Sequence, residues 1–369
     1  MKNRKIAIIG TSIGQRELYR KARLLGYYTI GFSWGTTDEM LSLMDKFYQI
    51  SIIEKDIIVQ KCREERVCGV VSNGSDLTSL IASYVAEKLN LTGTPYNTII
   101  NIQNKFWVRE QTKDLEGLSN INYYIYNGCQ TLSYPLVVKP VNGGGKSGVS
   151  YVTNEDSFNA AVDYASKHNE TILIEEYIEG LEISVESISF QGRHKVVQIT
   201  DKESTGAPHF IEVGHHQPSQ LPPYIQEKIR QIVPNILYRV GFKNGATHIE
   251  LKVNDDKIYL IEINSRGGGG EISNTLVELS TGYDYIAAMI KVATGTFKPQ
   301  KIVNRHCAGI YFICAQLKER FNFFCQLKNQ NWLITKQFDP KLPLTESTGN
   351  HDRNGYFIYQ SSNRIQIDI

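Results

Sequence analysis

Residues 246–270 read ATHIELKVNDDKIYLIEINSRGGGG, and this stretch decides how we interpret the fold of the whole chain. Two runs of alternating apolar residues flank the polar segment 254–257, which is the pattern of a β-hairpin. A three-residue loop at 255–257 would turn one apolar face toward a core. The pairs on that face would be Ile249 with Ile263, Leu251 with Ile261, and Val253 with Tyr259.

The opposite face of the same hairpin is polar. Its cross-strand pairs would be His248 with Asn264, Glu250 with Glu262, and Lys252 with Leu260. Two carboxylates placed directly opposite each other, with Cβ atoms roughly 5 Å apart, repel unless a cation lies between them. Two carboxylates and the Asn264 amide oxygen on a rigid sheet suit Mg²⁺, a hard cation that prefers oxygen ligands. A solvated polar face is the alternative interpretation.

Arg266 and the glycines at 267–270 follow the hairpin. A backbone without Cβ atoms beside a fixed guanidinium suits close approach to a phosphate group. Glu250, Glu262, Asn264 and Arg266 together resemble the metal-binding signature of the ATP-grasp superfamily. The resemblance implies ATP and Mg²⁺ as cofactors, with two metal ions for which Mn²⁺ can substitute.

The composition limits the class of protein. A chain of 369 residues, of which 41% are hydrophobic, can bury a large core and is long enough for two to three lobes. The formal net charge is +2 and the sequence has no basic run, so no nucleic-acid partner is expected. Six cysteines are scattered without a CxxC pair, which is typical of reduced thiols in an intracellular protein: Cys62, Cys68, Cys129, Cys307, Cys314 and Cys325.

Two segments bear on targeting and membranes. In the N-terminal sequence MKNRKIAIIG the apolar part is only four residues long before Gly10, so it predicts a first strand rather than a signal peptide. The longest nearly apolar segment, 307–315, is too short to span a bilayer. We therefore expect a soluble cytoplasmic protein with no membrane partner.

Residues 1–96 alternate between strand and helix patterns, which predicts a parallel sheet with right-handed crossovers. The turn GTSIGQ at 10–15 lacks the third glycine of GxGxxG, and no clear acidic residue ends the next strand. An NAD-dependent oxidoreductase is therefore disfavoured, and we interpret the turn as lining a substrate cleft. Residues 73–76, NGSD, follow a later strand and so lie at the carboxyl end of the sheet, where small ligands bind in such folds.

Two lysines and a glycine-rich loop form the next group. Lys105 lies in a segment that opens a predicted helix, and Lys139 ends a predicted strand just before VNGGGKSGV at 141–149. Successive backbone N–H groups in such a loop can surround phosphate oxygens, whereas an ordinary turn is the alternative. The resemblance makes Lys105 and Lys139 phosphate ligands and the loop a mobile lid whose nucleotide-binding residues are Gly143, Gly144, Gly145, Lys146 and Ser147. The order Lys146-Ser147-Gly148 departs from the more usual Ser-Lys/Arg-Gly, so the role of Lys146 stays open.

The segment TILIEEYIEGLE at 171–182 joins an apolar strand to several acidic residues. By pattern alone it could be a solvated acidic edge. The resemblance assigns it to adenosine, with Glu175 and the backbone of Glu176 and Ile178 at the adenine and Glu182 at the ribose. Backbone amides can read an amino-purine edge, and a carboxylate can accept two hydroxyl hydrogen bonds.

Residues 201–223 show no strong periodicity, and we expect a loop there before a helix at 223–240. The adjacent histidines His215 and His216 disfavour a metal site, because neighbouring side chains point in different directions and the spacing is not HxxxH. The sequence EVGH resembles that of L-amino-acid ligases, which implies that Glu212 and His215 contact an amino-acid substrate. Alternatively, both residues merely close the site.

The expected fold class is α/β, with an ATP-grasp organisation. We predict a parallel pre-ATP-grasp domain at 1–96, an ATP-grasp domain at 97–300 with a lid at about 113–182, and a small mixed C-terminal lobe at 301–369. The resemblance covers roughly residues 5–300, and we find no independent chemistry in the C-terminal lobe.

The resemblance implies an ATP-dependent carboxylate–amine ligase that acts on small-molecule carboxylate and amine substrates. A carboxylate would attack the γ-phosphorus to give an acyl phosphate and ADP, and an amine would then displace phosphate to form an amide. We expect an amino acid as a substrate, and the candidate catalytic residues are Arg266, Lys139, Glu212 and His215. A ligase for a sugar or nucleotide amine, a non-catalytic ATP-binding protein, and a homodimer are left open.

Overall fold

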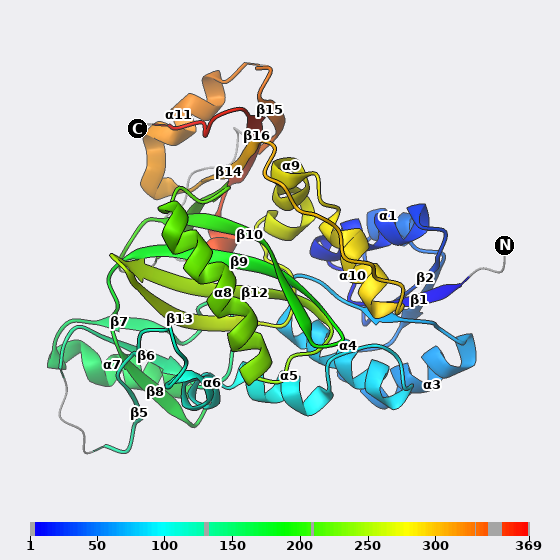
Figure 1. The fold of residues 1–369 in the computed structure, drawn as a ribbon, viewed down its shortest axis with the longest axis horizontal. Coiled ribbons are helices and arrows are strands. Elements are labelled where there is room, and N and C mark those ends of the chain that lie inside the picture. The colour runs from blue at the N-terminus through cyan, green and yellow to red at the C-terminus, as the bar shows by residue number, and fades with distance from the viewer. Residues whose placement is uncertain (1–3, 129–132, 208–209, 329, 339–348, 368–369) are drawn as a thin grey trace.

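The computed structural model describes residues 4–128, 133–207, 210–328, 330–338 and 349–367, and these residues form three β-sheets (Figure 1). Cys129, one of the predicted thiols, lies outside the described residues, and the other five cysteines are free. A search of the described helices finds none that is both long and apolar enough to cross a membrane.

The first sheet is parallel, as predicted, with the strand order β3-β2-β1-β4. Side chains of β1 alternate between two cores: Ala7 and Ile9 pack against α3 and α4, and Ile6 and Ile8 pack against α1 and α10. Its elements are β1 Lys5–Ile9, η1 Ile13–Gln15, α1 Arg16–Leu24, β2 Tyr28–Ser33, α2 Asp38–Leu43, β3 Lys46–Gln49, α3 Lys55–Glu65, β4 Val70–Val71 and α4 Asp76–Lys88.

The second sheet is antiparallel, with the order β5-β8-β6-β7, and α7 packs on it. The glycine-rich loop joins β6 to β7, so it leaves the sheet directly after Lys139. Helix α6 begins at Lys105 because the Asn104 side chain accepts a hydrogen bond from the Trp107 backbone N–H, which confirms the predicted start. The elements are α5 Tyr96–Gln103, α6 Lys105–Thr112, β5 Tyr123–Ile125, β6 Leu136–Pro140, β7 Ser150–Val152, α7 Glu155–Ser166 and β8 Ile172–Glu176.

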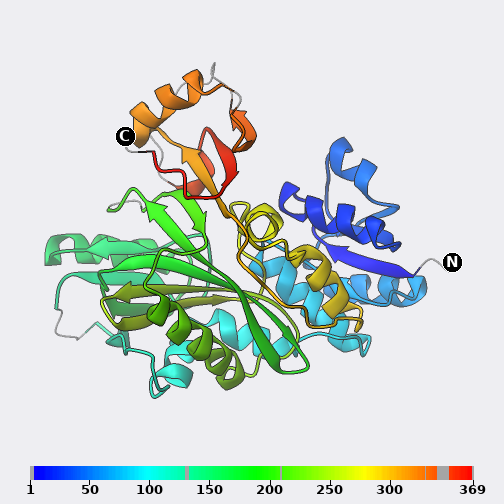
Figure 2. The same cartoon turned by 45° about the horizontal axis from the view of Figure 1, so that its top comes forward.

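The third sheet has the order β13-β12-β9-β10-β11-β14-β16-β15, and α8 covers the apolar face of its first strands. The C-terminal strands β14, β16 and β15 extend this sheet beyond β11, and Figure 2 shows the C-terminal elements projecting from that end. The domain boundaries at 96 and 300 stay predictions. The remaining elements are β9 Leu181–Phe190, β10 Arg193–Ser204, β11 Glu212–Gln217, α8 Pro223–Arg239, β12 Gly245–Asn254, β13 Lys257–Asn264, η2 Ile272–Leu276, α9 Val277–Thr281, α10 Tyr285–Ala293, β14 Cys307–Ile313, η3 Ala315–Leu317, α11 Lys318–Gln326, β15 Leu333–Phe338, η4 Asn350–Asp352 and β16 Gly355–Ser361.

The predicted register of the hairpin is right for the half that carries the acidic residues and wrong for the half near the turn. His248 pairs with Asn264 and Glu250 with Glu262, but a bulge follows, so that Leu251 pairs with Leu260. The turn therefore has two residues rather than three, and the partners predicted for Leu251, Lys252 and Val253 are each wrong by one. Ile258 and Leu260 are buried in place of Tyr259 and Ile261.

Two parts of the segment expected to be a loop at 201–223 are strands. Strand β10 continues to Ser204, and Glu212–Gln217 forms β11, which lies between β10 and β14 in the sheet. His215 and His216 are both buried and point to opposite faces, as expected of neighbouring residues in extended backbone. The loop prediction failed because this strand carries polar residues on both faces and therefore lacks the apolar alternation that marks a strand.

Candidate functional site

The two carboxylates of the hairpin lie directly opposite each other, as predicted, and cationic side chains hold both. Glu250 Oε1 lies 3.0 Å from Lys202 Nζ and 3.2 Å from His248 Nε2. Glu262 Oε1 lies 3.0 Å from Lys105 Nζ. Burial alone would raise the pKa of Glu250, but the Lys202 and His248 cations hold it well below its usual range. Protein cations therefore offset the repulsion between the two carboxylates.

Glu250, Glu262 and Asn264 present two carboxylates and one amide oxygen on one face of the hairpin. Within the described part of the chain, no group of three or more His, Cys, Asp or Glu side chains is placed to hold a metal ion. A metal bound here would therefore need the Asn264 amide and oxygens from a ligand as well. Such a partial, oxygen-only donor set is what Mg²⁺ accepts, because it keeps waters and substrate phosphates as ligands. The three residues fit a hard cation and remain the candidate metal ligands.

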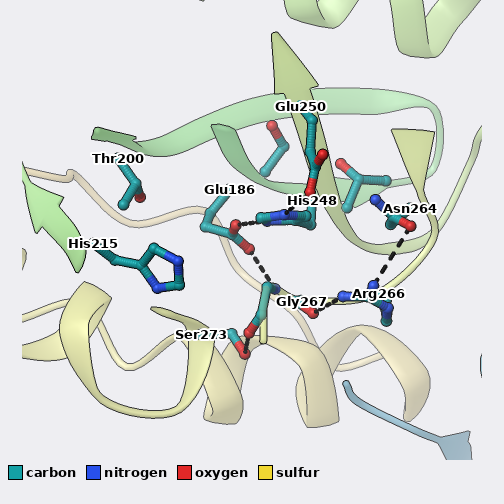
Figure 3. A network of polar contacts seen from close by, with 12 residues as sticks. Glu186, Thr200, His215, His248, Glu250, Asn264, Arg266, Gly267 and Ser273 are labelled. Atoms are coloured by element: carbon teal, nitrogen blue, oxygen red, sulfur yellow. Dashed lines mark hydrogen bonds and ion pairs between the residues drawn. The ribbon is translucent and has the colours of Figure 1, made fainter. Parts of the chain in front are cut away.

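The buried imidazole of His248 contacts two carboxylates beside the candidate metal ligands, and the sequence analysis assigned it no role. Figure 3 shows His248 between Glu186 and Glu250, and its Nδ1 atom lies 2.5 Å from Glu186 Oε1. Burial lowers the pKa of His248, but the two carboxylates outweigh burial and raise it to about 9. Glu186 also accepts a hydrogen bond from the Gly268 N–H at 2.9 Å. A Cβ at Gly268 would lie 2.7 Å from both side chains, so this contact requires glycine.

The glycine run at 267–270 is tied to the loops at the carboxyl ends of the parallel strands. Asn73 Oδ1 accepts from the Gly267 N–H at 3.1 Å, and Asp76 Oδ1 accepts from Arg266 Nε at 3.0 Å. Gln15 fixes Asn73 in turn, because it accepts from the Asn73 N–H at 2.9 Å. Residues 73–76 thus lie at the site, as their position after a strand predicted.

Lys139 belongs to a buried group that we call the positive cluster, formed by Arg109, Lys139 and Glu175. Glu175 Oε1 lies 2.8 Å from Arg109 Nε, and Glu175 Oε2 lies 2.5 Å from Lys139 Nζ. Burial would raise the pKa of Glu175, but the two cations lower it to about 2. Two cations share one carboxylate, so the cluster carries an excess positive charge that a phosphate could balance.

Arg109 was not predicted, although its spacing could have indicated it. It follows Lys105 by four residues on α6, and residues four apart lie on the same helix face. Its Nη2 atom donates to the backbone carbonyl of Ile261 at 3.0 Å. Ile261 is the extra residue of the hairpin bulge, so Arg109 joins the positive cluster to the hairpin at the point where the register shifts.

The predicted lid lies between β11 and the two lysines that are predicted to bind phosphate, Lys105 and Lys139. Lys105 Nζ donates to the Gly143 carbonyl at 2.7 Å, and Gly143, Gly145 and Gly148 have positive φ. Lys146 also has positive φ (64°), and its Nζ atom donates to the Phe210 carbonyl at 2.7 Å. The same ammonium lies 3.9 Å from Glu212 Oε1, so Lys146 reaches toward the predicted amino-acid site.

The predicted adenosine residues are divided by the structure. The Glu175 carboxylate faces the positive cluster, where it holds Lys139. Glu176 accepts hydrogen bonds from the backbone and side-chain N–H groups of Asn122, and the Ile178 carbonyl accepts from Lys252 Nζ at 2.8 Å. Glu182 pairs across the strands with Lys252, and its carboxylate lies 2.9 Å from Lys202 Nζ. Their roles in nucleotide binding stay predictions.

Lys202 forms a second group, the negative cluster, together with Glu182, Glu212 and Glu250. Its Nζ atom lies 2.9, 2.8 and 3.0 Å from their respective carboxylates, so one buried ammonium is shared by three acids. Burial would lower the pKa of Lys202, but the three carboxylates raise it well above its usual value. Lys202 was missed because residues 201–204 had been assigned to a loop, whereas they lie on β10.

The two residues predicted to contact an amino acid lie together on β11. His215 Nε2 lies 3.2 Å from Glu212 Oε2, and His215 Nδ1 lies 3.2 Å from the Gly270 carbonyl oxygen. Both partners are acceptors, so each can accept a hydrogen bond from a ring nitrogen that carries a proton. His216 is bonded to Tyr359 on the other face, away from these groups.

The chain is similar to several known proteins. Residues 132–275 match the family model described as the ATP-grasp domain. The solved structure of an L-amino acid ligase from Bacillus licheniformis is similar to this chain, with a TM-score of 0.82 and 25% identity over 98% of this chain and 94% of that one.

Two curated proteins are also similar. The ATP-grasp enzyme fsqD of Aspergillus fumigatus is 27% identical over 267 residues, which are 61% of this chain and 46% of that protein. The D-alanine–D-alanine ligase of Flavobacterium johnsoniae is 29% identical over 161 residues, or 40% of this chain and 50% of the ligase. This chain thus spans about half the length of each. Residues 132–275 therefore carry an ATP-grasp domain, and the fold of the chain as a whole is similar to that of an L-amino acid ligase.

Proposed function

We propose that the protein is an ATP-dependent carboxylate–amine ligase that forms an amide through an acyl phosphate, and that an amino acid is one of its substrates. The observation that carries this proposal is the juxtaposition of the two clusters. Arg109 belongs to the positive cluster and contacts the hairpin that also carries Glu250 of the negative cluster. One site thus has an excess of positive charge, which suits phosphate, beside an excess of carboxylates, which suits a metal ion and an ammonium group.

The first step would make the acyl phosphate. A carboxylate oxygen of the donor, as we call the carboxylate substrate, attacks the γ-phosphorus, and the bond from that phosphorus to the bridging oxygen breaks to release ADP. Lys105 and Lys139 would bind phosphate oxygens, and Arg266 would orient the reacting carboxylate. A divalent cation held by Glu250, Glu262 and Asn264 would neutralise phosphate charge during this transfer.

The second step would make the amide. The nitrogen of the acceptor, as we call the amine substrate, attacks the acyl carbon, the carbon–oxygen bond to phosphate breaks, and inorganic phosphate leaves. The nitrogen must lose a proton as the bond forms. Glu212 is the candidate for binding an ammonium group. His215, whose Nε2 atom lies 3.2 Å from Glu212 Oε2, is the candidate for taking this proton.

ADP release and trapping of the acyl phosphate test this proposal together. The protein is mixed with ATP, Mg²⁺ and amino acids, singly and in pairs, and ADP is measured; hydroxylamine then replaces the acceptor. The expected result is ADP release that depends on Mg²⁺ and on the amino acid, with a hydroxamate of the donor when hydroxylamine is present. ADP release that is independent of every carboxylate, without hydroxamate, would contradict the proposal.

A further inference from the structure

Arg353, which comes from the C-terminal residues between η4 and β16, reaches the amino-acid end of the site. Its guanidinium carbon lies 3.7 Å from the centre of the Phe312 ring, and its Nη1 atom lies 3.4 Å from the Glu212 carbonyl oxygen. The side chain is half-buried, and no carboxylate of the described residues lies within ion-pair distance of it. A guanidinium has five N–H donors, and among the described residues Arg353 makes one hydrogen bond, to the Glu212 carbonyl.

Arg320 shows what a structural arginine looks like in the same region. It stacks on Tyr311, the residue before Phe312, with its guanidinium carbon 4.7 Å from the ring centre. Unlike Arg353, it is 7% exposed, lies 3.5 Å from a Glu203 carboxylate oxygen and donates to the Val213 carbonyl at 2.8 Å. Because side chains of β14 alternate, the two arginines lie on opposite faces of one strand. Among the described residues, Arg353, on the side of the site, has no carboxylate within ion-pair distance, and it interacts with the Glu212 carboxylate at longer range.

Phe312 connects Arg353 to the residues of the site. Its ring meets His215 edge-on with centroids 5.4 Å apart, and a Cβ at Gly270 would lie 2.6 Å from His215 and 3.3 Å from Phe312. A chain of contacts therefore links Arg353 through Phe312 to His215 and to Gly270, the last residue of the glycine run. Figure 3 shows Arg266 well separated from His215, on the Asn264 side of the network. The reacting carboxylate of the donor belongs beside Arg266, so an anion beside Arg353 belongs to another group.

We infer that Arg353 binds the carboxylate of the acceptor, so that the acceptor is an amino acid with a free carboxylate rather than a neutral or sugar amine. The inference rests on the proposed ligase function and extends it. A planar guanidinium can hold a carboxylate with two parallel hydrogen bonds, and stacking on Phe312 fixes its plane. The C-terminal lobe, in which the sequence indicated no chemistry, would thus select the second substrate.

The test compares acceptors in the full-length Arg353→Gln variant. Each reaction uses one donor, ATP and Mg²⁺ with an amino-acid acceptor, the same acceptor as its carboxamide, or hydroxylamine. In the unaltered protein the amino acid is expected to react at least tenfold more efficiently than its carboxamide. In Arg353→Gln we compare the amide formed with the amino acid and the hydroxamate formed with hydroxylamine. The ratio of amide to hydroxamate should fall at least tenfold, because the KM for the amino acid rises. Arg320→Gln removes a stacked guanidinium from the other face and should keep the acid-over-carboxamide preference.

Arg353→Lys is the second variant, because it keeps the charge and loses the planar fork. Its preference for the amino acid should lie between those of the unaltered protein and Arg353→Gln. An unchanged acid-over-carboxamide preference in Arg353→Gln would overturn the inference. A changed KM for the donor in the hydroxylamine reaction would also overturn it, because Arg353 would then act on the donor. Absence of hydroxamate with the unaltered protein would refute the ligase function itself, which separates the two failures.

Discussion

The positive cluster and the negative cluster are both buried, yet their charges are unbalanced in opposite directions. In the positive cluster Arg109 and Lys139 share the single carboxylate of Glu175. In the negative cluster three carboxylates surround the ammonium of Lys202, and one of them, Glu250, is also bonded to the His248 imidazole. Buried charges are costly when unpaired, so such imbalances persist where a ligand completes them. The difference indicates a ligand that brings anionic phosphate to one cluster and cations to the other.

Removing a carboxylate from the hairpin should break this complementarity most severely. Glu250→Gln and Glu262→Gln should each raise the activation barrier by several kcal/mol and so remove most of the turnover. The reason is that a bound metal supplies both charge neutralisation and orientation. Nucleotide should still bind, as measured by calorimetry. Asp255→Asn, an exposed acid at the turn of the same hairpin, is the matched control. Ordinary Mg²⁺-dependent turnover in both glutamine variants would refute the metal assignment.

Glu175→Gln should destabilise the fold, because it leaves Arg109 and Lys139 buried without their carboxylate. Loss of one partner from a buried ion pair costs about 3–5 kcal/mol. The pKa of Glu175 is about 2 in the folded protein, below its ordinary value of 4.5, so its stabilisation is present above pH 4.5 and is lost as the pH falls toward 2. The difference in the free energy of unfolding between the two proteins should therefore shrink across this range in denaturant titrations.

Glu176→Gln is the matched control for that measurement, because Glu176 is the neighbouring acid and its carboxylate, among the described residues, bonds to Asn122 rather than to a cation. It should change stability by less than about 1 kcal/mol. A pH-independent difference between Glu175→Gln and the unaltered protein would show that Glu175 is not ionised in the positive cluster.

Substitutions on β11 test whether residues at the negative cluster bind the amino-acid substrate. Glu212→Gln and His215→Ala should leave ATP binding nearly unaltered but strongly reduce amino-acid-dependent ADP formation, since both residues lie at the amino-acid end. Steady-state kinetics with ATP and with the amino acid as the varied substrate measure the two effects separately. If KM and kcat for the amino acid move by less than about threefold, or roughly 0.7 kcal/mol, the two residues only close the site. His216→Gln, on the opposite face of the strand, is the control.

The smallest expected effect concerns the glycine-rich loop beside the positive cluster. Glycines lose much backbone freedom on ordering, so hydrogen exchange across residues 141–150 should slow when ATP and Mg²⁺ are added. The turn between β9 and β10 at Gln191–Gly192 lies in a different hairpin and should exchange at an unaltered rate. Equal exchange in the loop at saturating ATP would argue against a phosphate-binding lid.

The hairpin shows where sequence reasoning stops. Period-two alternation placed Glu250 opposite Glu262, and the structure confirms this pair. The same reasoning misplaced the pairs near the turn, because the bulge at Ile261 coincides with a hydrogen bond from Arg109, a residue more than one hundred positions away. Local alternation carries no information about such a contact.

The segment at 201–217 contains strands that the sequence did not predict. Its polar residues gave no strand signal, yet β10 and β11 place Lys202 beside His215 in register. The polar side chains of these strands are satisfied by partners from elsewhere in the chain, such as Glu250 for Lys202 and Tyr359 for His216. A buried strand can therefore be polar when distant groups pair with it.

The sequence by itself determined the parallel sheet, the opposed carboxylates of the hairpin and the resemblance to ATP-grasp proteins, because short-range spacing and side-chain chemistry encode them. Only the tertiary structure decided which charges meet: Arg109 with Glu175, Lys202 with three carboxylates, and Arg353 with the end of β11. The physical reason is that ion pairing acts through space over a few ångströms, whereas these partners lie far apart along the chain and are brought together by the packing of the sheets.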